Sequence, residues 1–288
     1  MRLRNFFMLI LVFVLPLLAA NAYADTPGIG TAAPFAVLGE AGVTNTGPSV
    51  INGSVAGSAG TPAVTGFPPG IVVAPGVLIT TGVANSGPGT PFGDATAAYN
   101  AAQGLLGAIP IFTNLGGLTL TPGTYSLGAA QLTGTLLLNA LGSNNAQWTF
   151  QIASSLTTAS ASTVEVINSG APGAFTGGIT WAVTSSATLG TTTTFLGTII
   201  SLAGDAIQTG ATIGCGRVIS LDASVTLDTN VINTGCTVTA GTGGGGGTIT
   251  PPAPVPEPGT LALLSFGLLA MVFLTFRNSR VSSLSLSC

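Results

Sequence analysis

The chain has no histidine and no lysine, and charged residues make up 5% of its 288 positions, against about a quarter in an ordinary globular domain. Histidine is the usual general base and the commonest metal ligand, so its absence argues against an acid–base or metal-dependent enzyme. Four of the five arginines lie near the chain ends, which leaves Arg217 as the one base in between. Neutralising phosphates takes a cluster of basic side chains, so we expect no nucleic-acid partner.

The eight acidic residues are scattered, without the spacing of a catalytic pair or a set of metal ligands. We therefore assign no catalytic residue, no cofactor and no metal site. A weak calcium site formed by Asp222 and Asp228 stays open as a lesser alternative. Apolar residues make up 46% of the chain, and such an apolar, weakly charged composition argues against disorder.

What the chain does contain is an internal repeat between Trp181 and Ile232, with a period of 18–19 residues. Leu196–Leu202 recurs as Cys215–Leu221, and Ala206–Thr209 recurs as Ser224–Leu227. Each copy alternates small polar residues with Val, Ile or Leu, which is the period of a half-buried strand. A unit this short buries its apolar face only against copies of itself, so the repeat predicts a mainly β fold, a β-solenoid.

The first 24 residues predict a secretory signal peptide. Two arginines precede the apolar run Phe6–Leu18, and Ala22–Ala24 provides a small-x-small cleavage site. An uncleaved membrane anchor is the alternative, although the apolar run is short for a membrane span. We expect the mature chain to begin near Asp25 and to lie outside the cytoplasm.

The mature body is predicted to cover residues 25–239. Residues 47–92 are rich in Gly, Pro, Asn and Ser but carry β-branched runs, so we expect an ordered insertion with short strands. Residues 93–106 form the one predicted helix, with Asp94 as its N-cap and a series of alanines after it. Strands separated by short turns are expected from residue 118 onward.

Cys215 and Cys236 are about one coil of the repeat apart. In a compartment that permits oxidation, this spacing predicts a disulfide between adjacent coils. The loop-entropy model gives such a crosslink about 3 kcal/mol of stabilisation. Two buried free thiols are the alternative.

The C-terminal segment has a different character. A glycine run and several prolines at residues 240–255 predict a spacer. The parts that follow, over residues 256–288, are Pro256, Glu257 and Pro258, the apolar run Leu261–Phe276, the basic end Arg277–Arg280, and the tail 281–288. Residues 256–280 resemble a PEP-CTERM sorting signal, which implies that an exosortase, a membrane protease-transpeptidase, removes the transmembrane helix. A plain C-terminal membrane anchor is the alternative, and both place the body in the medium or at the cell surface.

A series of motifs in the body forms a second resemblance. In chain order they are Leu38, Val43–Pro48, Thr65–Gly70, Ala98–Ala102, Leu120–Tyr125, Phe150–Ile152, Leu156–Thr158 and Trp181–Asp228. Together they resemble the secreted microbial ice-binding (antifreeze) proteins built on a discontinuous β-solenoid. The resemblance implies a right-handed, triangular β-helix with one long α-helix packed alongside, an insertion that interrupts it, and an N-terminal strand among the later coils.

Strand geometry explains why such a fold suits an ice surface. Stacked strands lie about 4.7–4.9 Å apart, and alternate residues along a strand lie about 6.6–6.8 Å apart. Both distances are close to oxygen repeats in hexagonal ice. Threonine suits this surface because its methyl group organises water, its hydroxyl anchors water, and its branched side chain is stiff.

One face of the solenoid is the predicted site. Thr188 should point outward beside the inward-pointing Leu189, and the repeat assigns its position to later coils. The predicted ice-binding residues are Thr44, Thr46, Thr157, Thr188, Gln208 and Thr226. A second face carries Thr198 together with Arg217, and the charge makes that face less suitable. Gln208 departs from a pure threonine column.

These features predict an extracellular, non-enzymatic protein that adsorbs to ice and inhibits its growth or recrystallisation. The main alternative is a cell-surface adhesin or matrix protein that binds extracellular polysaccharide. Trp148 and Trp181 weaken that alternative, because they alternate as core residues do instead of forming an exposed aromatic platform. A polysaccharide-cleaving β-helix enzyme would need a cluster of carboxylates or bases along one groove, which the sequence does not offer.

Overall fold

The computed structural model describes residues 28–58, 63–170 and 175–235. The predicted signal peptide, spacer, sorting signal and tail, together with Cys236, lie outside the described residues. Within the described ranges, no helix is long and apolar enough to cross a membrane.

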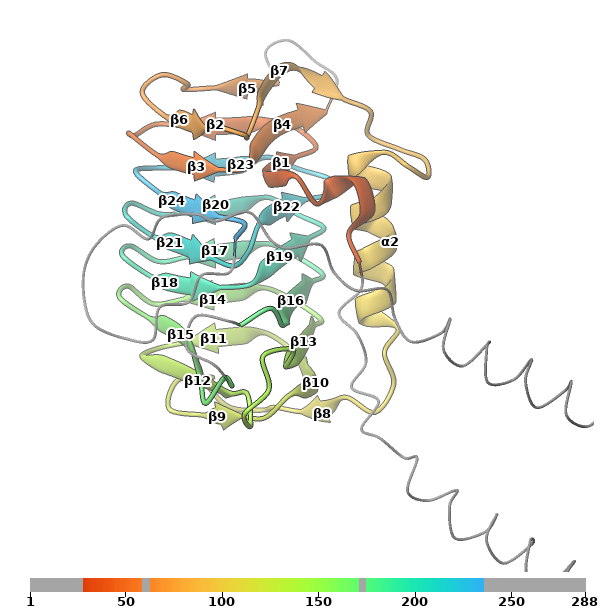
Figure 1. The fold of residues 1–288 in the computed structure, drawn as a ribbon, viewed down its shortest axis with the longest axis vertical. Helices are drawn as coiled ribbons and strands as arrows, with labels where there is room; N and C mark the ends of the chain where they lie inside the picture. Colours follow the sequence, from red (N-terminus) through yellow and green to blue (C-terminus); the bar gives the residue numbers. More distant parts are fainter. Residues whose placement is uncertain (1–27, 59–62, 171–174, 236–288) are drawn as a thin grey trace, which may run out of the picture. The chain divides into compact units, whose positions relative to one another are not determined.

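Three parallel β-sheets, here named A, B and C, form the described body (Figure 1). Sheet A consists, in spatial order, of β7 (Leu78–Val83), β4 (Ser54–Ser58), β1 (Phe35–Gly39), β22 (Val218–Ser220), β19 (Thr198–Ser201), β16 (Gly178–Val183), β13 (Gln147–Ile152), β10 (Gly123–Leu127) and β8 (Ile109–Pro110). Sheet B consists of β11 (Ala130–Leu132), β14 (Leu156–Thr158), β17 (Ala187–Leu189), β20 (Asp205–Ile207), β23 (Val225–Leu227), β2 (Val43–Asn45) and β5 (Val64–Thr65). Sheet C consists of β6 (Ile71–Val73), β3 (Val50–Asn52), β24 (Val231–Asn233), β21 (Thr212–Gly214), β18 (Thr194–Leu196), β15 (Thr163–Ile167), β12 (Thr135–Asn139) and β9 (Thr119–Leu120).

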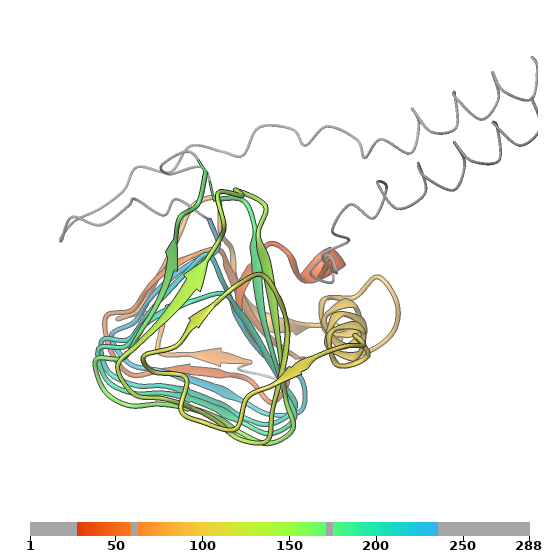
Figure 2. The same cartoon turned by 90° about the horizontal axis from the view of Figure 1, so that it is seen from below.

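Each complete turn of the chain, or coil, contributes one strand to each sheet, whereas at the ends of the stack β7 stands alone and β8 and β9 have no companion strand in sheet B. The strands β13, β14 and β15 form one coil, and β16, β17 and β18 form the next. Viewed along the stack, the coils superimpose as a triangle, with the α-helix α2 (Pro91–Gln103) outside one side (Figure 2). The prediction of a mainly β fold with one α-helix is confirmed for the described part of the chain.

The coils are stacked in an order that differs from their order in the sequence. Strand β1 pairs with β22, so the first coil, β1 to β3, lies on the last coil, β22 to β24. The coil β4 to β6 follows, and β7 ends sheet A. The resemblance had implied an N-terminal strand among the later coils, whereas the N-terminal coils extend the stack beyond them. Residues 47–92, expected to interrupt the solenoid, supply β3 to β7 and lengthen it.

Helix α2 begins and ends earlier than the predicted range of 93–106. Thr90 is the N-cap, and its Oγ1 accepts a hydrogen bond from the Gly93 N–H at 3.1 Å. Pro91 occupies the first turn, where a missing N–H costs nothing. The predicted N-cap, Asp94, instead accepts hydrogen bonds from the backbone N–H and hydroxyl of Thr31, at 2.8 and 2.7 Å. These bonds hold the pKa of Asp94 below its ordinary value and join the helix to the short 3₁₀ helix η2 (Gly30–Ala32).

The outer face of sheet A is covered by α2. Buried helix residues, Phe92, Ala95, Ala98, Tyr99 and Ala102, pack on outward-pointing residues of the sheet, including Leu38, Ala182, Ile200 and Ile219. The Gln151 amide donates hydrogen bonds to the carbonyl oxygens of Ala102 and Leu105, at 2.9 and 2.8 Å, and so satisfies the C-terminus of the helix. Leu106, the last residue of the predicted helix, lies beyond α2 and is 95% exposed.

Aromatic rings stack through the interior of the triangle. The ring centroids of Phe150 and Trp181 are 3.9 Å apart with nearly parallel planes, and Tyr125 and Phe195 continue the stack on either side. Trp148 and Trp181 are both fully buried, as their alternation predicts. The run 132–138 is divided between β11 and β12 at a corner where Gly134 adopts a φ of 87°.

Candidate functional site

The outer face of sheet B presents an in-register column of short side chains. In each three-residue strand the middle residue points outward because both of its neighbours are buried, as in the pattern of Val43, Thr44 and Asn45. The parallel register aligns these middle residues across the sheet. In spatial order the column is Gln131, Thr157, Thr188, Ala206, Thr226, Thr44 and Thr65.

Four of the predicted site residues, Thr44, Thr157, Thr188 and Thr226, lie in this column. Gln131 and Thr65 complete its ends, and the prediction did not include them. Both stand in recognisable patterns, because Ala130-Gln131-Leu132 has the form of Ala187-Thr188-Leu189 and Val64-Thr65 has that of Val43-Thr44.

The register predicted for Gln208 is wrong. Ala206, and not Gln208, lies between Thr188 and Thr226. Gln208 follows two residues later and is exposed on the same face. It belongs to a second column with Asp228 and Thr46.

The register of Gln208 was predicted wrongly because the turn between sheets A and B varies in length from coil to coil. Ser201 and Ser220 are paired, and so are Asp205 and Val225. Three residues separate Ser201 from Asp205, but four separate Ser220 from Val225. The repeat is therefore longer at this corner than the predicted alignment assumed.

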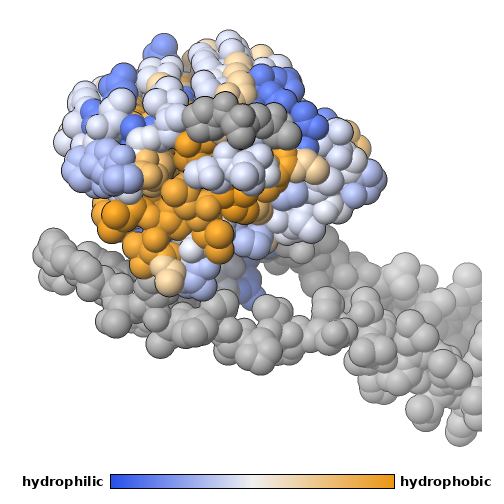
Figure 3. Space-filling model, turned by 90° about the horizontal axis from the view of Figure 1, so that it is seen from above, coloured by the Kyte–Doolittle hydropathy of each residue, from blue (hydrophilic) through white to orange (hydrophobic). Residues whose placement is uncertain are grey.

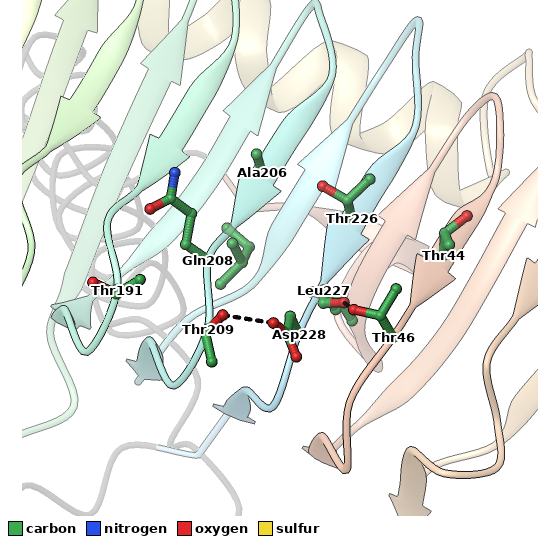
Figure 4. Close-up of a pocket in the computed structure, with 10 residues that line it drawn as sticks. Thr44, Thr46, Thr191, Ala206, Gln208, Thr209, Thr226, Leu227 and Asp228 are labelled. Carbon is green, nitrogen blue, oxygen red and sulfur yellow. Dashed lines mark hydrogen bonds between the residues drawn. The ribbon is translucent and has the colours of Figure 1, made fainter.

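A shallow hollow of about 380 Å³ lies at the centre of sheet B, where Ala206 provides no hydroxyl (Figure 4). Gln208 and Thr226 stand beside Ala206, and Asp228 lies at the side of the hollow. The Asp228 carboxylate accepts a hydrogen bond from Thr209 Oγ1 at 2.5 Å and another from Thr229 Oγ1 at 2.9 Å. These bonds, that of Thr209 first, lower the pKa of Asp228, so this side chain is ionised at neutral pH.

The alternative face, that of Thr198 and Arg217, is covered. Thr198 is 8% exposed. The Arg217 guanidinium donates hydrogen bonds to the carbonyl oxygen of Ala33 at 2.8 and 3.1 Å, which holds the N-terminal segment over sheet A. Coverage by this segment and α2, in addition to the charge that the sequence indicated, makes sheet A unsuitable as a flat binding surface.

Sheet C carries a further column that the sequence analysis missed. Thr135, Thr163, Thr194 and Thr212 are aligned by register and are exposed or half-buried. The column continues with apolar residues, Val231, Val50 and Ile71, of which Ile71 is 54% exposed. Sheet C is thus threonine-bearing along part of its length and apolar along the rest.

The end of the stack formed by β5, β6 and β7 is apolar (Figure 3). Val77 is 55% exposed there, and Phe67, Val72 and Leu78 are only partly buried because no strand of the described residues lies beyond β5, β6 and β7. This end differs from the polar outer face of sheet B.

The remaining predicted residues occupy separate places. Cys215 is half-buried at the corner before β22, and since Cys236 lies outside the described residues, the disulfide stays a prediction. Among the residues that the structure describes, no three His, Cys, Asp or Glu side chains form a group that suits a metal ion. Asp205 is buried and accepts a hydrogen bond from the Ala187 N–H at 2.8 Å.

Known proteins share this stack of parallel coils, which in this chain carries threonine columns on its outer faces. Residues 37–233 match the ice-binding-like family, and residues 254–280 match the PEP-CTERM protein-sorting motif. An ice-binding protein of Nostoc sp. (strain HG1) is 43% identical over 248 residues, with 85% of each chain covered. The chain therefore belongs to the ice-binding-like family.

Solved structures agree with this assignment. The crystal structure of an ice binding protein from an Antarctic biological consortium is 37% identical, with a TM-score of 0.65, and the match covers 74% of this chain and 92% of that one. The ice-binding protein of the Antarctic ascomycete Antarctomyces psychrotrophicus is 35% identical, with a TM-score of 0.63, covering 73% of this chain and 98% of that one.

Proposed function

We propose that this protein adsorbs to ice through the outer face of sheet B and inhibits the growth or recrystallisation of ice. The observation that carries this proposal is the column of outward-pointing threonines, which is in register from β14 to β5 apart from Ala206. Membership of the ice-binding-like family supports it. We infer that the stack is a right-handed, discontinuous β-solenoid, as the resemblance implies.

The mechanism follows from the spacing of the side chains. Neighbouring strands of a sheet place threonines about 4.7–4.9 Å apart, a repeat close to oxygen spacings in ice. Thr44 and Thr65 lie on adjacent strands, and their hydroxyl oxygens are 3.4 Å apart. Water ordered by such a column joins the crystal lattice. Between adsorbed molecules the ice front becomes curved, and further growth is opposed.

We infer that the protein acts outside the cytoplasm. The PEP-CTERM motif at residues 254–280 supports export and processing by an exosortase-type enzyme, with the body released or held at the cell surface. The predicted signal peptide at residues 1–24 supports the same route. Mass spectrometry of the mature chain from fractionated cells tests both cleavages.

The binding face is tested by recrystallisation inhibition with matched variants of the full chain, purified as the cell processes it. Thr188→Tyr and Thr226→Tyr each place a bulky ring on sheet B, and Thr194→Tyr places the same ring on sheet C. We expect the parent and the sheet C variant to be active and both sheet B variants to lose activity. An inactive parent contradicts ice binding, and equal loss in all three variants contradicts the choice of sheet B.

Polysaccharide binding is the less favoured function. Sugars are commonly held against exposed aromatic rings, and both tryptophans of this chain are buried in the core. A glycan-binding screen of the active protein distinguishes the two functions: saturable sugar binding without any effect on ice would favour an adhesin.

A further inference from the structure

The threonine column of sheet B is interrupted in the middle. Gln131, Thr157 and Thr188 lie on one side of Ala206, and Thr226, Thr44 and Thr65 lie on the other. Ala206 is half-buried at the hollow, with its methyl group toward the surface between the two parts (Figure 4). The face is thus two short blocks of side chains separated by one strand, β20.

The threonine hydroxyls on the two sides of Thr44 have different hydrogen-bond partners. On the side away from Ala206, Thr65 Oγ1 donates to Thr44 Oγ1 at 3.4 Å. Beside Ala206, the Thr226 hydroxyl instead donates to the backbone carbonyl of Asp205 at 3.3 Å. A hydroxyl that donates to the backbone can still accept from surface water, but it has no proton left to donate to that water.

The second column adds two features unfavourable to ordered water at the same place. Gln208 carries a long, rotatable side chain beside the hollow (Figure 4). Asp228 holds a carboxylate in place through Thr209 and Thr229 and stays ionised at neutral pH. The hollow has room for on the order of ten water molecules, and those beside a carboxylate are oriented by its charge.

We propose that Ala206 and Asp228 determine the strength of ice adsorption, by limiting the continuous ice-matched surface to the two blocks beside the hollow. This inference rests on the proposed function of sheet B and names the two positions that restrict it. Removing the interruption should increase activity, and a gain of activity does not arise from a loss of folding.

The test compares two variants that each extend a threonine column by one hydroxyl. Ala206→Thr joins the two blocks of sheet B, and Val231→Thr extends the column of sheet C next to Thr212. We expect a severalfold lower concentration for half-maximal recrystallisation inhibition with A206T and no change with V231T. Asp228→Asn, which removes the charge and keeps the shape, should also lower that concentration.

The outcomes separate this inference from the proposed function. If the parent is active and T188Y abolishes activity while A206T and D228N leave it unchanged or weaker, the role of these two positions is rejected and sheet B remains the ice-binding face. If V231T increases activity as much as A206T, the effect is not specific to the interruption, which also rejects the inference. If the parent is inactive, both proposals fail.

Discussion

Asp205 should make the stability of this protein fall as the pH rises toward neutrality. Its side chain is 2% exposed at the start of β20, and desolvation by burial raises its pKa from the ordinary 3.8 to about 7. Hydrogen bonds from Ser201 and the Ala187 N–H oppose this rise without cancelling it. The folded state therefore keeps the carboxyl proton up to about pH 7, whereas the unfolded chain releases it near pH 3.8.

The local geometry accommodates a neutral carboxylic acid. Ser201 Oγ lies 2.8 Å from Asp205 Oδ2 and 2.7 Å from the carbonyl oxygen of Ala203. The single proton of the Ser201 hydroxyl can be donated to only one of these two oxygens. A protonated Asp205 donates to Ser201 Oγ, which then donates to Ala203, so that every group has a partner.

The sign and size of the effect follow from linkage. Because the folded state binds the extra proton, the stabilisation is fully present below pH 3.8 and is lost as the pH rises to about 7. Each pKa unit corresponds to about 1.4 kcal/mol, so the loss is on the order of 4 kcal/mol. Asp205→Asn keeps an oxygen acceptor for the Ala187 N–H and a donor for Ser201, without a titrating proton.

Urea unfolding between pH 4 and 8, followed by tryptophan fluorescence, measures this difference. The free energy of unfolding of the parent relative to D205N should decrease across that range. Asp94 and Asp228 have lowered pKa values, so any stability they add is lost at low pH instead. Both residues are present in the parent and in D205N, so the difference between the two free energies of unfolding does not contain their contribution. Asp222→Asn, at an exposed carboxylate, is the control. A constant difference between the parent and D205N would refute the reasoning.

Three further substitutions test the packing. Trp181→Ala removes the ring stacked at 3.9 Å on Phe150 and should cost about 3–5 kcal/mol in urea unfolding; a cost within error of zero would contradict the aromatic stack. Gln151→Leu removes the donor at the C-terminus of α2 and should speed amide hydrogen exchange there, with exchange in sheet C as the internal control. Gly66→Ala places a Cβ 1.7 Å from the Asn45 carbonyl oxygen, at a φ of 81°, and should displace β5 and lower both stability and ice activity. Unchanged activity would exclude the β5 end of the face from binding.

The outward direction of the site residues was predictable from the sequence because the side-chain period of a strand is two. A slip of one residue would bury threonine and expose leucine, so the alternation fixes the direction strongly. The misplaced Gln208 shows the limit of that signal. The predicted alignment made the corner before β23 one residue shorter than the corner before β20, whereas it is one residue longer. The resulting error of two residues keeps the side chain on the same face, so the alternation does not reveal it.

The predicted start of the helix and the predicted order of the coils also differ from the structure, each for its own physical reason. The start of α2 was misplaced although Thr90 followed by Pro91 is a strong N-terminal signal, because the acidic side chain of Asp94 fitted the same role. Asp94 instead makes a contact 63 residues away, with Thr31. The order of the coils depends on pairing between β1 and β22, which are more than 170 residues apart in the chain, and the local pattern contains no information about that pairing.

The choice of the exposed face, by contrast, follows from residue types at outward positions. Strands of sheet A are apolar at both their inward-pointing and their outward-pointing positions, as in Val37 and Leu38 or Ile199 and Ile200. Strands that are buried on both faces have this composition. Such a sheet must be covered, and α2 covers it. The outward residues of sheet B are mostly threonine, whose exposure needs no such cover. The same outward-pointing threonines of sheet B therefore supply the surface proposed to bind ice, and one alanine among them accounts for its interruption.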